Sequence, residues 1–65
     1  MSDPRYVVRR LSGEPVAEND ELTVDSNYPV TLVRAVDATR ISIRWGWGAV
    51  EEIKASRAAV VVDRV

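Results

Sequence analysis

Residues 41–47, with the sequence ISIRWGW, carry the clearest secondary-structure signal in this 65-residue chain. Apolar side chains alternate there with polar or small ones, and this period of two predicts a half-buried β-strand. One face of the strand is expected to hold Ile41, Ile43, Trp45 and Trp47, and the other Ser42, Arg44 and Gly46. Gly46 and Gly48 flank Trp47 and are expected to bend the backbone, which redirects the second tryptophan away from the face of the first.

The segments around this strand predict further strands joined by turns. Residues 28–36 predict a long strand in which Arg34 shares a face with Val30, Leu32 and Val36, so only a turn or bulge would move Arg34 outward. Residues 37–40 predict a tight hairpin turn. Residues 6–11, 21–24 and 60–65 predict shorter strands, and residues 12–20 predict a polar loop. Residues 49–59 fit a helix on propensity, whereas a strand is merely tolerable.

The composition favours a mostly β domain. Twelve valines stand against three leucines, three isoleucines and no phenylalanine, and β-branched side chains suit a pleated sheet better than a helix. The chain is too short for two cores, so we expect one domain over residues 5–65 after a flexible N-terminus at residues 1–4. Because the core lacks phenylalanine, Trp45 is expected inside it, while Trp47 is expected either in the core or at an interface.

The order of these elements is similar to that of an SH3-like small barrel over residues 5–64. Residues 20–24, DELTV, resemble the acidic and then apolar end of the long first loop of such domains. Residues 53–58, IKASRA, lie where those domains carry a single 3-10 turn. The resemblance implies a five-stranded barrel with a short helical or 3-10 turn before the last strand. Residues 7–10, VVRR, replace most of the first aromatic cluster of polyproline-binding members, so recognition of polyproline is not expected.

The residue types exclude most catalytic chemistry. Cysteine and histidine are absent, which removes thiolate sites, the commonest metal ligand and the usual general base. Glu51 and Glu52 are adjacent and so do not converge on one substrate, and no serine has a histidine partner. We therefore expect a non-enzyme with no catalytic, cofactor-binding or metal-binding residues. The longest purely apolar run, residues 58–62, is too short to cross a bilayer, and the N-terminus lacks signal-peptide character, so a cytoplasmic protein is expected.

Trp45 and Trp47, together with Arg40 and Arg44, are the candidate partner-binding residues. Tryptophan is frequent at binding hot spots, which indicates a protein-interaction module with a protein partner. Aromatic rings beside arginines also suit stacking on bases, so the alternative is a nucleic-acid-binding barrel that uses Trp47, Arg40 and Arg44. With a net charge of −1, the protein is expected to have little sequence-independent affinity for phosphates, which counts against the nucleic-acid alternative.

The C-terminal valines indicate self-association. Val60, Val61, Val62 and Val65 put apolar groups on both faces of the last strand, and a domain this small has little material to cover both. We therefore expect a homodimer through this strand or through Trp47, and a purely structural homo-oligomer is a further alternative. Eight arginines against one lysine indicate a GC-rich bacterial or phage source, as for an accessory protein that binds a host or structural partner.

Overall fold

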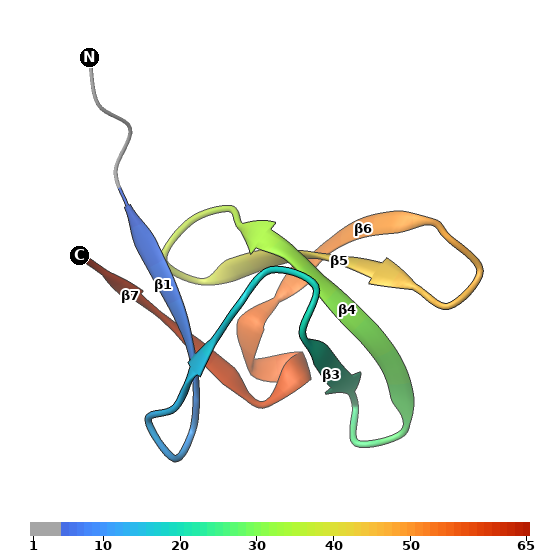
Figure 1. Ribbon diagram of the computed structural model, residues 1–65, viewed down its shortest axis with the longest axis horizontal. Coiled ribbons are helices and arrows are strands. Elements are labelled where there is room, and N and C mark those ends of the chain that lie inside the picture. Colours follow the sequence, from blue (N-terminus) through green and yellow to red (C-terminus); the bar gives the residue numbers. More distant parts are fainter. Residues whose placement is uncertain (1–4) are drawn as a thin grey trace.

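The computed structural model describes residues 5–65, and the flexibility expected for residues 1–4 lies outside the described residues. The chain forms seven strands and one 3-10 turn (Figure 1). In chain order these are β1 (Tyr6–Arg10), β2 (Pro15–Val16), β3 (Glu21–Val24), β4 (Tyr28–Ala35), β5 (Arg40–Trp45), β6 (Val50–Lys54), η1 (Ala55–Ala58) and β7 (Val60–Arg64). The prediction of a mostly β domain is confirmed.

The strands form two antiparallel sheets, and the five-stranded barrel expected from the sequence stays a prediction. One sheet has three strands in the order β2-β1-β7, and the other has four in the order β3-β4-β5-β6. Within the described residues the strand pairings do not close into a ring. The loop expected at residues 12–20 contains the short strand β2, because Val16 pairs with Val8 of β1. The edge strands of the three-stranded sheet are therefore β2 and β7.

The hairpin turn predicted at residues 37–40 is confirmed between β4 and β5. The Val36 N–H donates to the carbonyl of Arg40 at 3.0 Å, and the strands pair outward from there. The register shifts between Leu32 and Arg34, so a bulge interrupts the alternation of β4. Arg34 is exposed as a result, although its spacing from Leu32 placed it on the inner face.

Residues 49–59 are first strand and then 3-10 turn. Ile53 of β6 pairs with Ile41 of β5 and is buried, which explains why its segment is extended despite its helical propensity. The chain then turns, and the Ala55 N–H donates to the carbonyl of Thr39 at 2.9 Å. Ala59 ends the turn in the left-handed conformation with φ 54°. A short helical element before the last strand is thus confirmed.

The core is aliphatic and lies between the two sheets and η1. It consists of twelve buried residues: Val8, Val16, Leu22, Val24, Val30, Leu32, Ile41, Ile43, Ile53, Ala55, Ala58 and Val60. Trp45, expected inside the core, is instead half-buried and packs against its margin. The small alanines allow η1 to approach the strands closely, so the valine-rich sequence fills the core without a fully buried aromatic ring.

Candidate interaction surface

Three aromatic side chains meet at the end of the four-stranded sheet, and we call Tyr28, Trp45 and Trp47 the aromatic cluster. The rings of Trp45 and Trp47 are stacked, with centroids 5.1 Å apart and planes 6° from parallel. Tyr28 meets Trp45 edge to face at 6.4 Å. Trp47 is 76% exposed and Tyr28 is 52% exposed, so the cluster presents a broad apolar surface to solvent.

The β5–β6 turn explains why Trp47 lies on Trp45. β5 ends at Trp45, two residues earlier than the sequence pattern predicts. The Gly48 N–H donates to the carbonyl of Trp45 at 2.9 Å, and Gly48 has φ 98°, a conformation that side-chain-bearing residues rarely adopt. The turn folds Trp47 back onto Trp45. The expectation that the glycines would redirect Trp47 away from Trp45 is therefore wrong.

Glu51 orients the half-buried indole of Trp45. The Trp45 Nε1–H donates to Glu51 Oε1 at 3.0 Å. Glu51 pairs across the strands with Ile43, so it lies on the same face of the sheet as Trp45. The carboxylate therefore fixes one edge of the cluster and leaves a negative charge beside it.

A second contact supports the chain next to Tyr28. Asp25 lies in the turn between β3 and β4, and its carboxylate accepts from Arg57 of η1, from Nη2 at 2.9 Å and from Nε at 3.4 Å. The Asp25 N–H also donates to the carbonyl of Arg57 at 2.8 Å. The hydrogen bond from Arg57 lowers the pKa of Asp25, and the same bond raises the pKa of Arg57. This pair fixes the turn that precedes Tyr28.

The four candidate residues divide between two faces of the sheet. Trp45 and Trp47 belong to the aromatic cluster, whereas Arg44 directly precedes Trp45 in β5 and so points to the opposite face. Arg40 shares the face of Arg44, pairs across the strands with Lys54 and forms an ion pair with Asp37, with Nε and Oδ2 3.5 Å apart. The structure therefore brings the two tryptophans together but does not add the two arginines to them.

Sequence reasoning missed Tyr28 and Glu51. Tyr28 is seventeen residues from Trp45 in the sequence, and only the pairing of Val30 with Trp45 brings the start of β4 close to it. Glu51 was considered only with Glu52 as a pair of catalytic carboxylates, and the strand register that aligns it with Ile43 depends on a turn whose length the pattern did not fix. A hairpin centred on residues 46–49 would have indicated Glu51, whereas Tyr28 depends on the pairing of β4 with β5.

No group of three or more carboxylates within residues 5–65 is arranged to hold a metal ion. Over the same residues, no helix has the length and apolarity that a membrane crossing requires. A comparison of the chain with protein-family models, curated proteins and solved structures finds no match. The functional argument therefore depends on the residues and their geometry.

Proposed function

We propose that this chain is a small non-catalytic protein-interaction module and that the aromatic cluster is its partner-binding surface. One observation carries the proposal: Trp47 is 76% exposed and yet held flat against Trp45. Exposed tryptophan of this kind is common at binding hot spots, where its large ring is desolvated by a partner. A ring that is already ordered by stacking loses little conformational freedom on binding.

The surroundings of the cluster favour a protein partner over nucleic acid. The carboxylate of Glu51 contacts the cluster through Trp45 and would repel phosphates. Arg40 and Arg44, the arginines of the nucleic-acid alternative, lie on the other face of β5. The partner surface that suits the cluster is apolar or carries a cation, since cations are attracted both by indole faces and by Glu51.

The architecture that we infer for this module is SH3-like. The support is the element order, in which a long loop containing β2 precedes four paired strands, a 3-10 turn and a last strand that returns to β1. The buried Leu22 and Val24 belong to the DELTV segment that carries the resemblance. In contrast to the SH3 domains that bind polyproline, this chain has its aromatic surface at the β5–β6 hairpin, which projects from the sheet (Figure 1).

The test compares capture of partners by three forms of the immobilised protein. Trp47→Ser removes the exposed ring, and Leu11→Ser is the matched control because Leu11 is 73% exposed in the β1–β2 turn. From a lysate of the source organism, the wild type and Leu11→Ser are expected to retain the same protein and Trp47→Ser to lose it. With that protein purified, calorimetry is expected to show binding weakened about 30-fold by Trp47→Ser, the effect of losing a hot-spot residue.

Other outcomes would overturn the proposal. Equal capture by Trp47→Ser would show that the aromatic cluster does not bind the partner. Capture that nuclease treatment abolishes would support the nucleic-acid alternative. A wild type that captures only copies of itself would support the structural homo-oligomer.

A further inference from the structure

The outer face of Trp47 is a flat surface whose orientation is fixed. One face of the ring stacks on Trp45, with centroids 5.1 Å apart, and 76% of the residue is exposed, so the opposite face is open to solvent. The face of an aromatic ring is the negative part of its quadrupole, and indole attracts cations more strongly than the other aromatic side chains do. A planar group with a positive charge therefore suits this face.

Glu51 adds a carboxylate at the edge of the same stack. Its Oε1 accepts from Trp45 Nε1–H at 3.0 Å, and within the described residues Glu51 has no ion-pair partner within 4.0 Å. A hydrogen bond to a carboxylate also polarises the indole of Trp45 and makes its ring more electron-rich. Both effects favour a cation at the aromatic cluster.

Arg57 does not neutralise this carboxylate. The guanidinium of Arg57 is held by Asp25, with Nη2 and Oδ2 2.9 Å apart. The pKa of Arg57 is raised mainly by its hydrogen bond to Asp25 and to a smaller extent by the charge of Glu51, so Arg57 acts on Glu51 from a distance. The two carboxylates and one guanidinium of these three residues leave one net negative charge.

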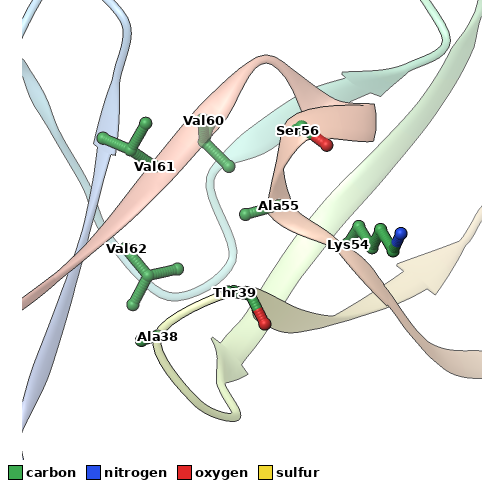
Figure 2. A pocket seen from close by; sticks show the side chains of 8 residues that line it. All are labelled: Ala38, Thr39, Lys54, Ala55, Ser56, Val60, Val61 and Val62. Atoms are coloured by element: carbon green, nitrogen blue, oxygen red, sulfur yellow. The ribbon is translucent and has the colours of Figure 1, made fainter.

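The groove between β7 and the β4–β5 turn is a poorer place for a cation. Figure 2 shows the eight side chains that line this groove of about 680 Å³, and the charged one among them is Lys54. Arg40 and Arg44 lie on the face of β5 opposite the aromatic cluster. A cationic group is repelled from both surfaces and attracted to the aromatic cluster.

We propose that the partner protein contributes an arginine side chain that stacks on the open face of Trp47. This inference rests on the proposed function and deepens it, because it names the chemistry that the aromatic cluster recognises. The guanidinium is planar and matches the flat indole, and its charge is attracted by the ring and by the Glu51 carboxylate. Because a guanidinium is more weakly hydrated than an ammonium group, arginine stacks at a lower desolvation cost than lysine.

The probe is a capped Gly-Arg-Gly peptide, and its matched control carries citrulline, which has nearly the same shape and no charge. In NMR spectra of the isotopically labelled protein, the arginine peptide is expected to shift the indole N–H signals of Trp45 and Trp47. The amides of Val60 and Val62 in the groove are expected to stay unchanged. The arginine peptide is expected to bind about threefold to fivefold more tightly than the citrulline peptide, as for a cation–π contact at an exposed site.

Two variants that each remove one negative charge test the role of the carboxylate. Glu51→Gln keeps an oxygen that accepts from Trp45 Nε1–H, and it is expected to weaken binding of the arginine peptide about threefold and to leave the citrulline peptide unchanged. Glu52→Gln is the matched control, because Glu52 pairs with Ser42 and so lies on the opposite face of β6. It is expected to bind both peptides as the wild type does. Trp47→Ser is expected to lose the preference for arginine over citrulline.

Three results would overturn the proposal. Absence of indole shifts with the arginine peptide would show that the cluster does not take this side chain. Equal affinity for the arginine and citrulline peptides would show that charge is not recognised. Equal losses in Glu51→Gln and Glu52→Gln would mean that net charge, and not the position of Glu51, determines binding.

The capture experiment separates these failures from failure of the proposed function. Where partner capture still depends on Trp47 but the peptides bind equally, the interaction module stands and the arginine inference is wrong. Where Trp47→Ser captures the partner as the wild type does, the proposed function is wrong, and the inference that rests on it is wrong as well.

Discussion

The two turns at the ends of β5 differ in how their shape is fixed. In the β4–β5 turn, the Asp37 carboxylate accepts from the N–H groups of Thr39 and Arg40, both at 2.8 Å, and the turn is held against η1 through the carbonyl of Thr39. Residues 46–49 of the β5–β6 turn are closed by backbone hydrogen bonds and depend on the positive φ of Gly48, and the side-chain hydrogen bond of this hairpin, from Trp45 to Glu51, joins the strands beside the turn. One end of the strand is thus fixed by polar contacts, while the other presents an apolar ring to solvent.

This difference shows how a small domain separates stability from binding along one strand. Ile41 and Ile43, between the two turns, are fully buried and join both to the core. The β4–β5 turn adds contacts to that core, whereas the β5–β6 turn places Trp47 outside it. The separation predicts a graded series of effects.

The largest expected effect is at the buried centre of β5. Ile43→Ala is expected to lower the free energy of unfolding by about 2–5 kcal/mol, because the cavity adds to the lost burial. For a domain of this size that is a large part of the total, so urea unfolding would show a partly unfolded population in water. Ile43→Val, the control, is expected to cost about 0.5–1.5 kcal/mol. A loss from Ile43→Ala no greater than that of the control would contradict the packing described here.

The β5–β6 turn is expected to be the next most sensitive region. Gly48→Val is expected to cost about 1–3 kcal/mol, because a β-branched residue is strained at this backbone conformation. A Cβ at Gly48 meets no atom within 4 Å, so the cost is conformational and not a clash. Gly46→Ala is the matched control, since Gly46 has equal space without a positive φ. Equal urea midpoints for the two variants would show that the turn does not require glycine.

Removal of the exposed Trp47 ring is expected to lower the free energy of unfolding by less than the two changes above. Trp47→Ala is expected to lower the free energy of unfolding by about 0.5–1.5 kcal/mol, the value of an aromatic pair, because most of the ring is already in water. Urea unfolding measures this change alongside that of Ile43→Ala. A loss as large as that of Ile43→Ala would mean that Trp47 belongs to the core.

The smallest effect is the dependence on pH through the polar turns. The N–H of Thr39 lowers the pKa of Asp37, and the hydrogen bond from Arg57 lowers that of Asp25. A carboxylate whose pKa is lower in the folded state stabilises the fold above its unfolded pKa, about 3.9, and this contribution is lost as the pH falls through the folded pKa. The melting temperature is therefore expected to be constant from neutral pH to about pH 5 and to fall below about pH 4. Asp37→Asn is expected to make the melting temperature depend less on pH below about pH 4. An unchanged pH dependence in this variant would contradict the contacts at the β4–β5 turn.

The predictable part of the fold is the part set by local pattern. The alternation over residues 41–45 and the breaker-like residues 37–40 correctly predict β5 and its first turn. Arg34 could not be placed, because a one-residue bulge reverses the side chains beyond it. The start of the 3-10 turn at Ala55 also depends on a residue distant in the sequence, because the Ala55 N–H donates to the carbonyl of Thr39. This contact opposes the helical propensity of residues 49–59, and local pattern does not reveal it.

The site was less predictable than the fold, since it depends on register. The importance of Trp45 and Trp47 follows from their size and scarcity, but their mutual stacking required the geometry of the β5–β6 turn. Arg44 and Arg40 are close to the tryptophans in sequence and still face the other side of the sheet. Tyr28 joins the cluster only through the pairing of β4 with β5.

The parallel stack of Trp45 and Trp47 also gives the molecule an optical signature. These are the only two tryptophans in the chain, and their rings lie 5.1 Å apart. Electronic transitions of two indoles this close couple, and where their transition moments are not parallel the coupling adds an exciton couplet to the β-sheet signal in far-ultraviolet circular dichroism. A ligand that inserts beside Trp47 or tilts its ring would change the couplet without any attached dye. The chain therefore contains its own chromophore pair at the surface proposed to bind a partner.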